Sequence, residues 1–363
     1  MPLAFQKCLF SEWDLRYNGF KDLRELLACG LQEDIMISKT KYHLDDSVIR
    51  SLFEAAGIKG ITDIGPLGAG EFNAVYSVRT PEKEYALKVA PADDVPVLTY
   101  EKDMMASEVF WYQRMREHSP IHVPEIHRAD FTRAIIPTPY FIMDKVPGKQ
   151  MDQMDFSETE KADALAETAR MVAQIHHIKN DKFGYVQNGL FDDWYQAIRS
   201  MIVNLIADAE KKHRKTARGV RLLSYVDKYR TILEKADCCM VNFDIWAPNI
   251  LCQRLEDGSI RYHWLDPERS FWGDRIVDFV CLETMAPLPE KKLSLSAYNA
   301  VAEHPVLATR EEQIRYGIAL GYLALIMEVE KYYRYSPFHF GWWRNVGASS
   351  LFYSRALERL KNG

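Results

Sequence analysis

The most informative stretch of this sequence is Val241-Asn242-Phe243-Asp244-Ile245-Trp246-Ala247-Pro248-Asn249-Ile250-Leu251. It sets Asp244 five residues before Asn249, which two apolar residues follow. Seventeen residues beyond Asn249 comes Asp266, and Glu268 stands two positions further on. Phosphoryl transfer to a hydroxyl needs such a set, because one carboxylate can orient or deprotonate the hydroxyl while an amide oxygen and a second carboxylate hold Mg²⁺ against nucleotide phosphates.

These residues therefore receive separate candidate roles. Asp244 is the candidate base, Asn249 and Asp266 are the candidate Mg²⁺ ligands, and Glu268 is a candidate ligand of a second metal ion. Taken singly, an aspartate or asparagine in a loop is more often a turn residue. The functional interpretation therefore depends on the order of several motifs along the chain.

Size and composition indicate a large globular protein. The chain has 363 residues, of which 47% are hydrophobic, enough for one domain in two lobes or for two domains. Its net charge of −5 gives no reason to expect nucleic acid or an anionic membrane as a partner. Six cysteines without a CxxC pair, and a beginning without a signal-peptide pattern, predict a cytoplasmic location. The longest apolar stretch, 318–327, is shorter than the roughly 20 residues of a membrane-spanning helix.

Periodicity predicts an α+β chain in two unequal lobes. Helices are expected over 45–56 and 104–117, and strands over 61–67, 74–78, 85–89, 123–129 and 140–143. Beyond the break at Pro147-Gly148 the pattern is mostly helical, over 157–178, 191–212, 219–236, 275–285, 310–333 and 348–361. We therefore expect an N-terminal extension over 1–44, a small sheet-rich N-lobe with its hinge over 45–146, and a larger, mostly helical C-lobe over 147–363.

A glycine pair lies between two predicted strands. A dinucleotide fingerprint would need a helix after the loop, whereas Gly68-Ala69-Gly70 is followed by Asn73 and then a strand. This context favours a hairpin over nucleotide phosphates, with Gly68 and Gly70 letting the backbone approach closely. The alternative is an ordinary glycine-containing hairpin.

Lys88 is a charged residue inside an apolar strand and so calls for a partner. A lysine on the third strand can reach the α- and β-phosphates when a helix glutamate holds it. Glu108, 20 residues on, is the best candidate for that glutamate, and Glu101 is the fallback. The alternative is a surface ion pair, which contributes only about 0–1 kcal/mol.

The segment joining the two lobes runs from Phe141 to Gly148. An apolar strand that continues into a crossover offers free backbone groups to an adenine edge. We expect the carbonyl of Asp144 and the amide of Val146 to serve in this way, although a plain linker would have the same sequence.

Three further polar residues have expected structural roles. Asp274 suits a helix N-cap, and Asp278 can fix the loop around Asp244 by accepting backbone N–H groups. His176 ends an apolar helix face, where a histidine is more often a satisfied core residue than a catalyst.

Together these motifs resemble the aminoglycoside phosphotransferase family, which has a protein-kinase-like fold. The resemblance covers roughly residues 45–335, and no Asp-Phe-Gly or Ala-Pro-Glu motif of protein kinases is present. The stretches that carry it beyond the nucleotide motifs are Pro124-Glu125-Ile126, Ala173-Gln174-Ile175-His176, Trp264-Leu265-Asp266-Pro267-Glu268 and Gly273-Asp274 with Asp278. The resemblance implies transfer of the γ-phosphoryl group of ATP, with Mg²⁺, to a hydroxyl of a small molecule.

The sequence departs from the family pattern at the catalytic loop. The family usually has His-Gly-Asp, where this chain has Asn242-Phe243-Asp244. Asn242 can still donate and accept hydrogen bonds, whereas Phe243 is bulkier than glycine and requires a different backbone or packing. Arg275 stands where proline is frequent. These changes bear on rate and substrate more than on reaction class.

The acceptor stays open at this level. Family members act on aminoglycosides, choline, sugars, homoserine or macrolides, and a polycationic antibiotic needs an acidic pocket. Segment 199–237 carries ten basic against five acidic residues and does not look like one. The acids considered as alternatives are Asp192, Asp193, Glu283, Glu328 and Glu330. Trp194, Tyr332, Trp342 and Trp343 are candidates for stacking on sugars or quaternary amines.

A second class of function competes with the kinase. A nucleotide-binding pseudokinase that regulates a partner would explain Asn242-Phe243 and the aromatic N-terminus, but not the presence of all the motif residues. A serine hydrolase is disfavoured because no GxSxG motif occurs. GTP in place of ATP and the oligomeric state both remain open.

Overall fold

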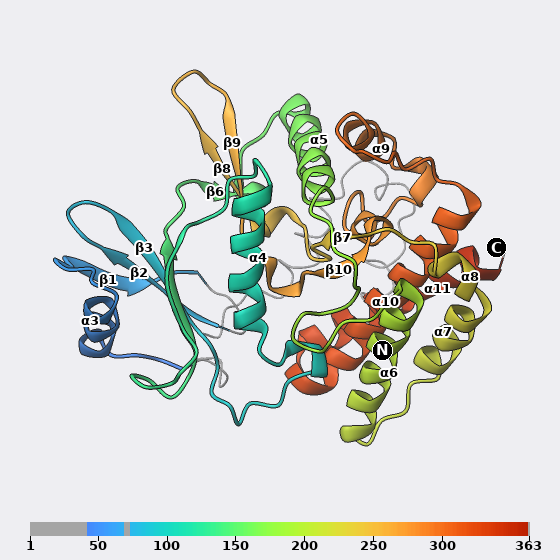
Figure 1. Cartoon of the computed structure of the whole chain (residues 1–363), viewed down its shortest axis with the longest axis horizontal. Coiled ribbons are helices and arrows are strands. Elements are labelled where there is room, and N and C mark those ends of the chain that lie inside the picture. Colours follow the sequence, from blue (N-terminus) through green and yellow to red (C-terminus); the bar gives the residue numbers. More distant parts are fainter. Residues whose placement is uncertain (1–41, 69–72, 362–363) are drawn as a thin grey trace.

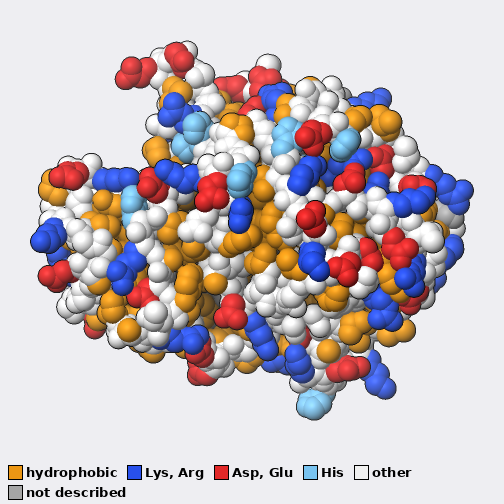
Figure 2. All heavy atoms as spheres, viewed as in Figure 1, with side chains coloured by type: hydrophobic (Ala, Val, Ile, Leu, Met, Phe, Trp, Pro, Cys, Tyr) orange, Lys and Arg blue, Asp and Glu red, His pale blue; other side chains and the backbone are white. Residues whose placement is uncertain are grey.

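The computed structural model describes residues 42–68 and 73–361. Most of the predicted N-terminal extension, and Gly70 of the predicted phosphate hairpin, lie outside the described residues. Among the described helices, none combines the length and the apolar character needed to cross a membrane. Figure 2 shows basic and acidic side chains interspersed over one face of the molecule, without one sign dominating it.

The N-lobe is built on a five-stranded antiparallel sheet with the order β1-β2-β3-β5-β4. Its strands are β1 (Asp63–Pro66), β2 (Ala74–Arg79), β3 (Glu84–Val89), β4 (Ile126–Asp130) and β5 (Tyr140–Asp144). Helix α4 (Met104–His118) lies between this sheet and the helices of the C-lobe, and α3 (Asp46–Ala55) lies at the far side of the sheet (Figure 1).

The two helices cover opposite faces of the sheet because strand side chains alternate. Leu87 and Val89 pack with Ile49, Leu52 and Phe53 of α3. Ala86 faces the opposite side of the sheet, where it packs with residues of α4 such as Val109. Lys88 has the same parity as Ala86, so the alternation aims its side chain toward α4.

The crossover between the lobes passes close to a C-lobe strand. Gly148 has φ +118°, and a Cβ at this position would lie 2.7 Å from the carbonyl oxygen of Cys252. Only glycine fits this approach and this backbone conformation without strain. The chain then enters β6 (Lys149–Gln150), which pairs with β8 (Ile250–Arg254).

The C-lobe packs its helices around one extended core. They are α5 (Glu158–Ile175), α6 (Trp194–Lys211), α7 (Ala217–Lys228), α8 (Arg230–Leu233), α9 (Lys292–Asn299), α10 (Arg310–Arg334) and α11 (Phe340–Lys361). Two small sheets carry the loops of interest: β7 (Cys238–Val241) pairs with β10 (Phe271–Asp274), and β8 pairs with β6 and β9 (Ile260–Trp264).

The structure corrects several predicted elements. The segment predicted as a helix over 275–285 is a 3₁₀ turn, Arg275–Val280, and the helix predicted over 219–236 is interrupted at Tyr229. Helix α9 and the C-lobe strands were not predicted from the sequence. These strands have two to five residues, and a short buried apolar run such as 238–241 gives no periodicity that separates strand from helix.

Candidate active site

Lys88 occupies the centre of the site. Its Nζ lies 2.7 Å from Oε2 of Glu108 on α4 and 2.7 Å from Oδ1 of Asp266 in the C-lobe. A third carboxylate, Oε2 of Glu268, lies 3.2 Å away. The predicted pairing with Glu108 is present, whereas the fallback residue Glu101 is bonded elsewhere, to the amide of Leu98.

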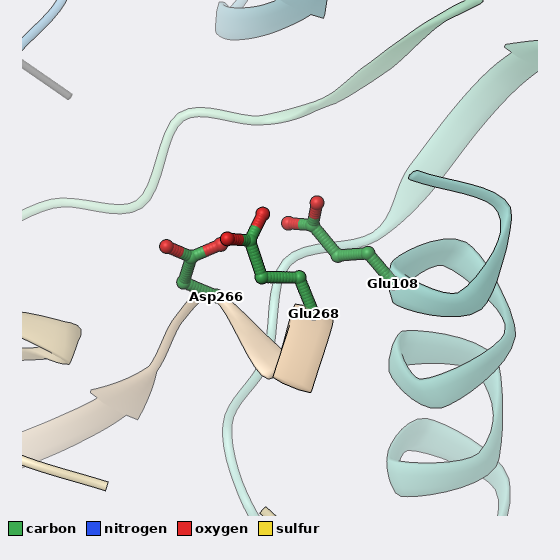
Figure 3. Close-up of side chains that lie close together, drawn as sticks. All are labelled: Glu108, Asp266 and Glu268. Atoms are coloured by element: carbon green, nitrogen blue, oxygen red, sulfur yellow. The ribbon is translucent and has the colours of Figure 1, made fainter. Parts of the chain in front are cut away.

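The two C-lobe carboxylates follow directly from β9. Asp266 has φ 60° and ψ 55°, a left-handed conformation that begins the 3₁₀ turn Pro267–Arg269 and sends both acidic side chains toward α4. Figure 3 shows the carboxylates of Asp266, Glu268 and Glu108 turned toward one another. The amide of Asp266 donates to the hydroxyl of Tyr112 (2.8 Å), and Asn73 donates to Glu268 (3.3 Å).

The electrostatics of this cluster suit a cation. Ligand oxygens of Glu108, Asp266 and Glu268 all lie within 4.8 Å of one another. Burial raises the pKa of Glu108 to about 8 against the opposing effect of Lys88. Burial and the neighbouring Asp266 raise the pKa of Glu268 as well. The raised pKa values reflect the mutual repulsion and burial of these acids, a cost that a bound cation relieves, and oxygen ligands are those that Mg²⁺ prefers.

A network of buried hydrogen bonds holds the loop that carries Asp244. The carboxylate of Asp278 accepts the backbone N–H groups of Asn242 (3.0 Å) and Phe243 (2.6 Å), as predicted. His176 lies between Asp278 (3.0 Å) and the hydroxyl of Tyr298 (2.8 Å), which is the satisfied core histidine expected from the sequence. Asp274 accepts from the amide of Ile276 and so caps the turn that presents Asp278.

The two unusual loop residues each have a defined place. Asn242 accepts the backbone N–H of Asp244 through Oδ1 (3.0 Å) and donates to Ser270 (3.3 Å). Phe243 has φ 60°, a region that glycine adopts without strain. Its ring is 2% exposed and packs against the rings of Tyr322 and Phe271. Aromatic packing thus holds a backbone geometry that glycine would adopt by itself.

Asn249 connects the loop to the acidic turn. Its Nδ2 donates to the carbonyl oxygen of Asp244 (3.0 Å), and its own carbonyl accepts the amide of Leu265 (2.8 Å), next to Asp266. Because the NH₂ group is used in this way, the amide oxygen is the atom left for a metal ion. The structure thus brings Asp244, Asn249 and Asp266 into one region, as the sequence predicts.

Sequence reasoning missed Arg269. Its Nε lies 3.7 Å from Oδ2 of Asp244, and its Nη2 lies 3.1 Å from Oε1 of Glu330 on α10. Glu330 also accepts from Nε of Arg334 (3.0 Å), which binds Glu101 in turn. The only local signal was a basic residue directly after the acidic motif. Burial and the carboxylates of Asp266 and Glu268 raise the pKa of Asp244 to about 7, although Arg269 opposes the shift.

The other predicted residues are less tightly gathered. Gly68 has φ +75° and is the last described residue before 69–72, which lie outside the described residues. Asp144 uses its side chain on Lys83 (2.6 Å) and His127, which leaves its carbonyl as the atom for a ligand. The amide of Val146 has no hydrogen-bond partner among residues 42–68 and 73–361.

Most acids considered for an acceptor pocket have structural partners. Asp192 binds Lys182 (2.8 Å), Asp193 caps α6, Glu283 accepts the amide of Ser294 (3.0 Å), and Glu328 binds Arg218 (3.2 Å). In the described part of the chain, Glu330 alone of the five is linked to Asp244, through Arg269. Trp194 is buried in the core, whereas Trp343 is half exposed.

Solved structures share this architecture. An aminoglycoside phosphotransferase, APH(2'')-Ib with ADP bound, is 18% identical, with 87% of this chain and 99% of that chain covered at a TM-score of 0.55. Choline kinase LicA from Streptococcus pneumoniae is 13% identical, with coverages of 88% and 99% and a TM-score of 0.54. A Ralstonia eutropha protein classed provisionally as an aminoglycoside phosphotransferase is 14% identical, with coverages of 87% and 99% and a TM-score of 0.60. At these identities the likeness establishes the protein-kinase-like fold.

The family is established by the sequence itself. No curated protein matches in a direct sequence comparison. A profile of the phosphotransferase enzyme family, however, matches residues 63–309, which is well over half of the chain and includes both lobes of the site. The chain therefore belongs to the phosphotransferase enzyme family, as the resemblance to aminoglycoside phosphotransferases predicted, and is a phosphotransferase of the small-molecule kinase type.

Proposed function

We propose that this enzyme transfers the γ-phosphoryl group of ATP to a hydroxyl of a small molecule, with Asp244 as the base. The observation that carries the proposal is the position of Lys88, bound at once to Glu108 of the N-lobe and to Asp266 of the C-lobe. A buried lysine held in this way stands where the two lobes would meet a triphosphate.

The nucleotide would bind between the lobes. In this proposal the hairpin that begins at Gly68 and contains Gly70 covers the phosphates, and Lys88 moves from Asp266 to the α- and β-phosphates while Glu108 keeps hold of it. The carbonyl of Asp144 and the amide of Val146 receive the adenine edge. The unpartnered amide of Val146 supports this last assignment.

Asn249, Asp266 and, at a second position, Glu268 would hold Mg²⁺. The fit rests on the donor set: carboxylate oxygens within 4.8 Å of one another and an amide oxygen left unengaged by the bond from Nδ2 to Asp244. When bound, Mg²⁺ would neutralise charge on the phosphates.

Asp244 orients the acceptor hydroxyl and takes its proton as the new phosphate ester forms. Its carboxylate is 31% exposed, so a substrate can reach it, while Asp278 and Asn242 fix its backbone. Burial raises the pKa of Asp244 in the metal-free protein, so its carboxylate accepts a proton more readily than that of a free aspartate.

Among the five acids considered for an acceptor pocket, the one linked to Asp244 is already paired with cations. Glu330, the acid linked to it, binds two arginines, Arg269 and Arg334. A polycationic aminoglycoside would have to displace these contacts, so we favour a hydroxylated acceptor with at most one net positive charge, such as a sugar, choline, homoserine or a macrolide. This ranks antibiotic phosphorylation, as in the aminoglycoside enzymes of the same fold, below a non-antibiotic substrate.

A panel assay tests the proposal. Purified full-length protein is given Mg²⁺, ATP or GTP, and in turn aminoglycosides, choline, sugars, homoserine and macrolides, with ADP or GDP release as the readout. Turnover on one acceptor that disappears in Asp244→Ala supports the kinase. A regulatory pseudokinase is the second candidate, favoured by Asn242 and Phe243 in the loop, and it predicts a nucleotide-dependent thermal shift without turnover on any acceptor.

A further inference from the structure

Arg269 sits beside the proposed base with part of its guanidinium unused. Nε faces Oδ2 of Asp244 at 3.7 Å, and Nη2 faces Oε1 of Glu330 at 3.1 Å. Nη1 makes no hydrogen bond to any residue of the described part of the chain, and the side chain is 18% exposed. A largely buried guanidinium stays charged and places its N–H groups in a fixed plane. The edge of that plane that carries Nη1 is therefore left for a ligand.

The surrounding ion pairs position this side chain rather than merely neutralise it. Glu330 holds Arg269 from α10, and Arg334, which also binds Glu101, holds Glu330. A chain of alternating charges, each largely buried, restricts the guanidinium to one orientation. A solvated surface arginine would have no such support, so a purely incidental pair with Asp244 does not account for it.

The distance from Arg269 to Asp244 is compatible with contact to a transferring group. A hydroxyl bound to Asp244 lies about 2.6–3.2 Å from its carboxylate, and the attacked phosphorus lies about 3–3.5 Å beyond. A γ-phosphoryl group that approaches Asp244 from the side of Arg269 therefore comes within reach of the guanidinium, whose Nε is 3.7 Å from the same carboxylate.

We propose that Arg269 is a further catalytic residue, which donates from its free edge to an oxygen of the γ-phosphoryl group in the transition state. This inference rests on the proposed function. In the step, the bond between the acceptor oxygen and phosphorus forms, the bond from phosphorus to the β-phosphate oxygen breaks, Asp244 receives the hydroxyl proton, and ADP leaves. Arg269 balances the charge that spreads over the transferring oxygens.

A transition-state analogue tests this without knowledge of the acceptor. ADP, Mg²⁺ and aluminium fluoride imitate a planar transferring phosphoryl group, and calorimetry measures how much the fluoride tightens ADP binding. In the wild-type protein we expect a gain of about 10²-fold or more, as transition-state analogues show. Arg269→Gln should bind Mg·ADP as the wild type does but lose most of that gain, and Arg269→Lys should recover part of it.

Arg199→Gln is the matched control. It removes the same charge from an arginine that pairs with Asp227 outside this network (3.1 Å), and it should keep the gain from fluoride. Thermal melts of all three variants show whether a loss follows from misfolding. With an acceptor from the panel, Arg269→Gln should lower kcat by about 10²–10³-fold, with the KM for ATP unchanged.

Several results would overturn the inference. If Arg269→Gln keeps the gain, or if fluoride adds nothing to wild-type ADP binding, the guanidinium does not meet the transferring group. A change confined to the KM of the acceptor would assign the free edge to the acceptor instead. If the wild-type protein does not bind Mg·ADP at all, the proposed function falls together with this inference.

Discussion

Lys88 and Asp266 lie 178 positions apart in the sequence, yet Nζ of the lysine is 2.7 Å from Oδ1 of the aspartate. The contact joins the N-lobe sheet to the turn after β9 in the C-lobe. Each partner is also a candidate for binding Mg·ATP, the lysine through the phosphates and the aspartate through the metal. If both proposed assignments hold, binding of Mg·ATP has to separate this ion pair.

Removal of Lys88 should destabilise the protein through Glu108. Lys88→Met leaves a carboxylate with 1% side-chain exposure without its cation, and breaking a buried pair in this way costs about 3–5 kcal/mol. The double variant Lys88→Met/Glu108→Leu should recover part of the loss, because it removes the most deeply buried carboxylate, while Asp266 and Glu268 still lack the ammonium. Urea unfolding measures both, and a single variant as stable as the wild type would contradict the account.

Asp278 should affect turnover more than nucleotide binding. Asp278→Asn replaces one acceptor oxygen by an NH₂ group that faces the N–H groups of Asn242 and Phe243, so the loop with Asp244 loses its anchor. We expect kcat on the best acceptor to fall by about 10²-fold, as for a misplaced catalytic group, while calorimetry shows Mg·ATP affinity within about twofold of wild type. An equal loss in both quantities would mean that Asp278 supports the whole lobe.

Restoring the family glycine at position 243 should weaken the fold. Phe243→Gly relieves left-handed strain of about 1–2 kcal/mol, but it empties a site packed against Tyr322 and Phe271, which costs about 3–5 kcal/mol for a large aromatic residue. The cavity outweighs the strain, so urea unfolding should show a net loss of about 1–4 kcal/mol. A more stable variant would show that the aromatic packing contributes little.

A buried amine in the C-lobe predicts a pH-dependent stability. Lys291 is fully buried, donates to the carbonyl of Glu283 (2.7 Å), and burial lowers its pKa from 10.5 to about 7. Between these values the unfolded chain binds the extra proton, so this residue makes stability rise with pH, by up to about 1.4 kcal/mol per unit. The unfolding free energy of the wild type, minus that of Lys291→Met, should increase from pH 7 to pH 10 and stay level below pH 7. A flat difference across the whole range would show that the amine stays charged.

Sequence reasoning located the elements of the site whose spacing is diagnostic. Lys88 stood out because a charge inside an apolar strand needs a partner, and Asp278 because an acid after a helix cap can accept backbone N–H groups. The lobes and most helices followed from periodicity. The C-lobe strands could not be predicted from periodicity, because runs such as 238–241 are short and wholly buried.

The arginine network could not be read from the sequence. Arg269 and Glu330 are 61 positions apart, and their contact depends on how α10 packs beside the turn Pro267–Arg269. Each alone resembles an ordinary surface charge. The packing of Phe243 could not be predicted from the sequence either. Its ring contacts Tyr322 and Phe271, which are distant in the sequence, and these contacts hold its backbone.

The most direct test of the central claim is a calorimetric titration of ATP with and without Mg²⁺. We predict that wild-type protein binds ATP tightly only with Mg²⁺, that Asp266→Asn and Asn249→Ala lose most of this metal-dependent gain, and that Asp244→Asn keeps it while losing all turnover. Equal ATP affinity without Mg²⁺, or an Asp266→Asn variant that binds Mg·ATP as the wild type does, would contradict the assignment of these residues to one nucleotide and metal site.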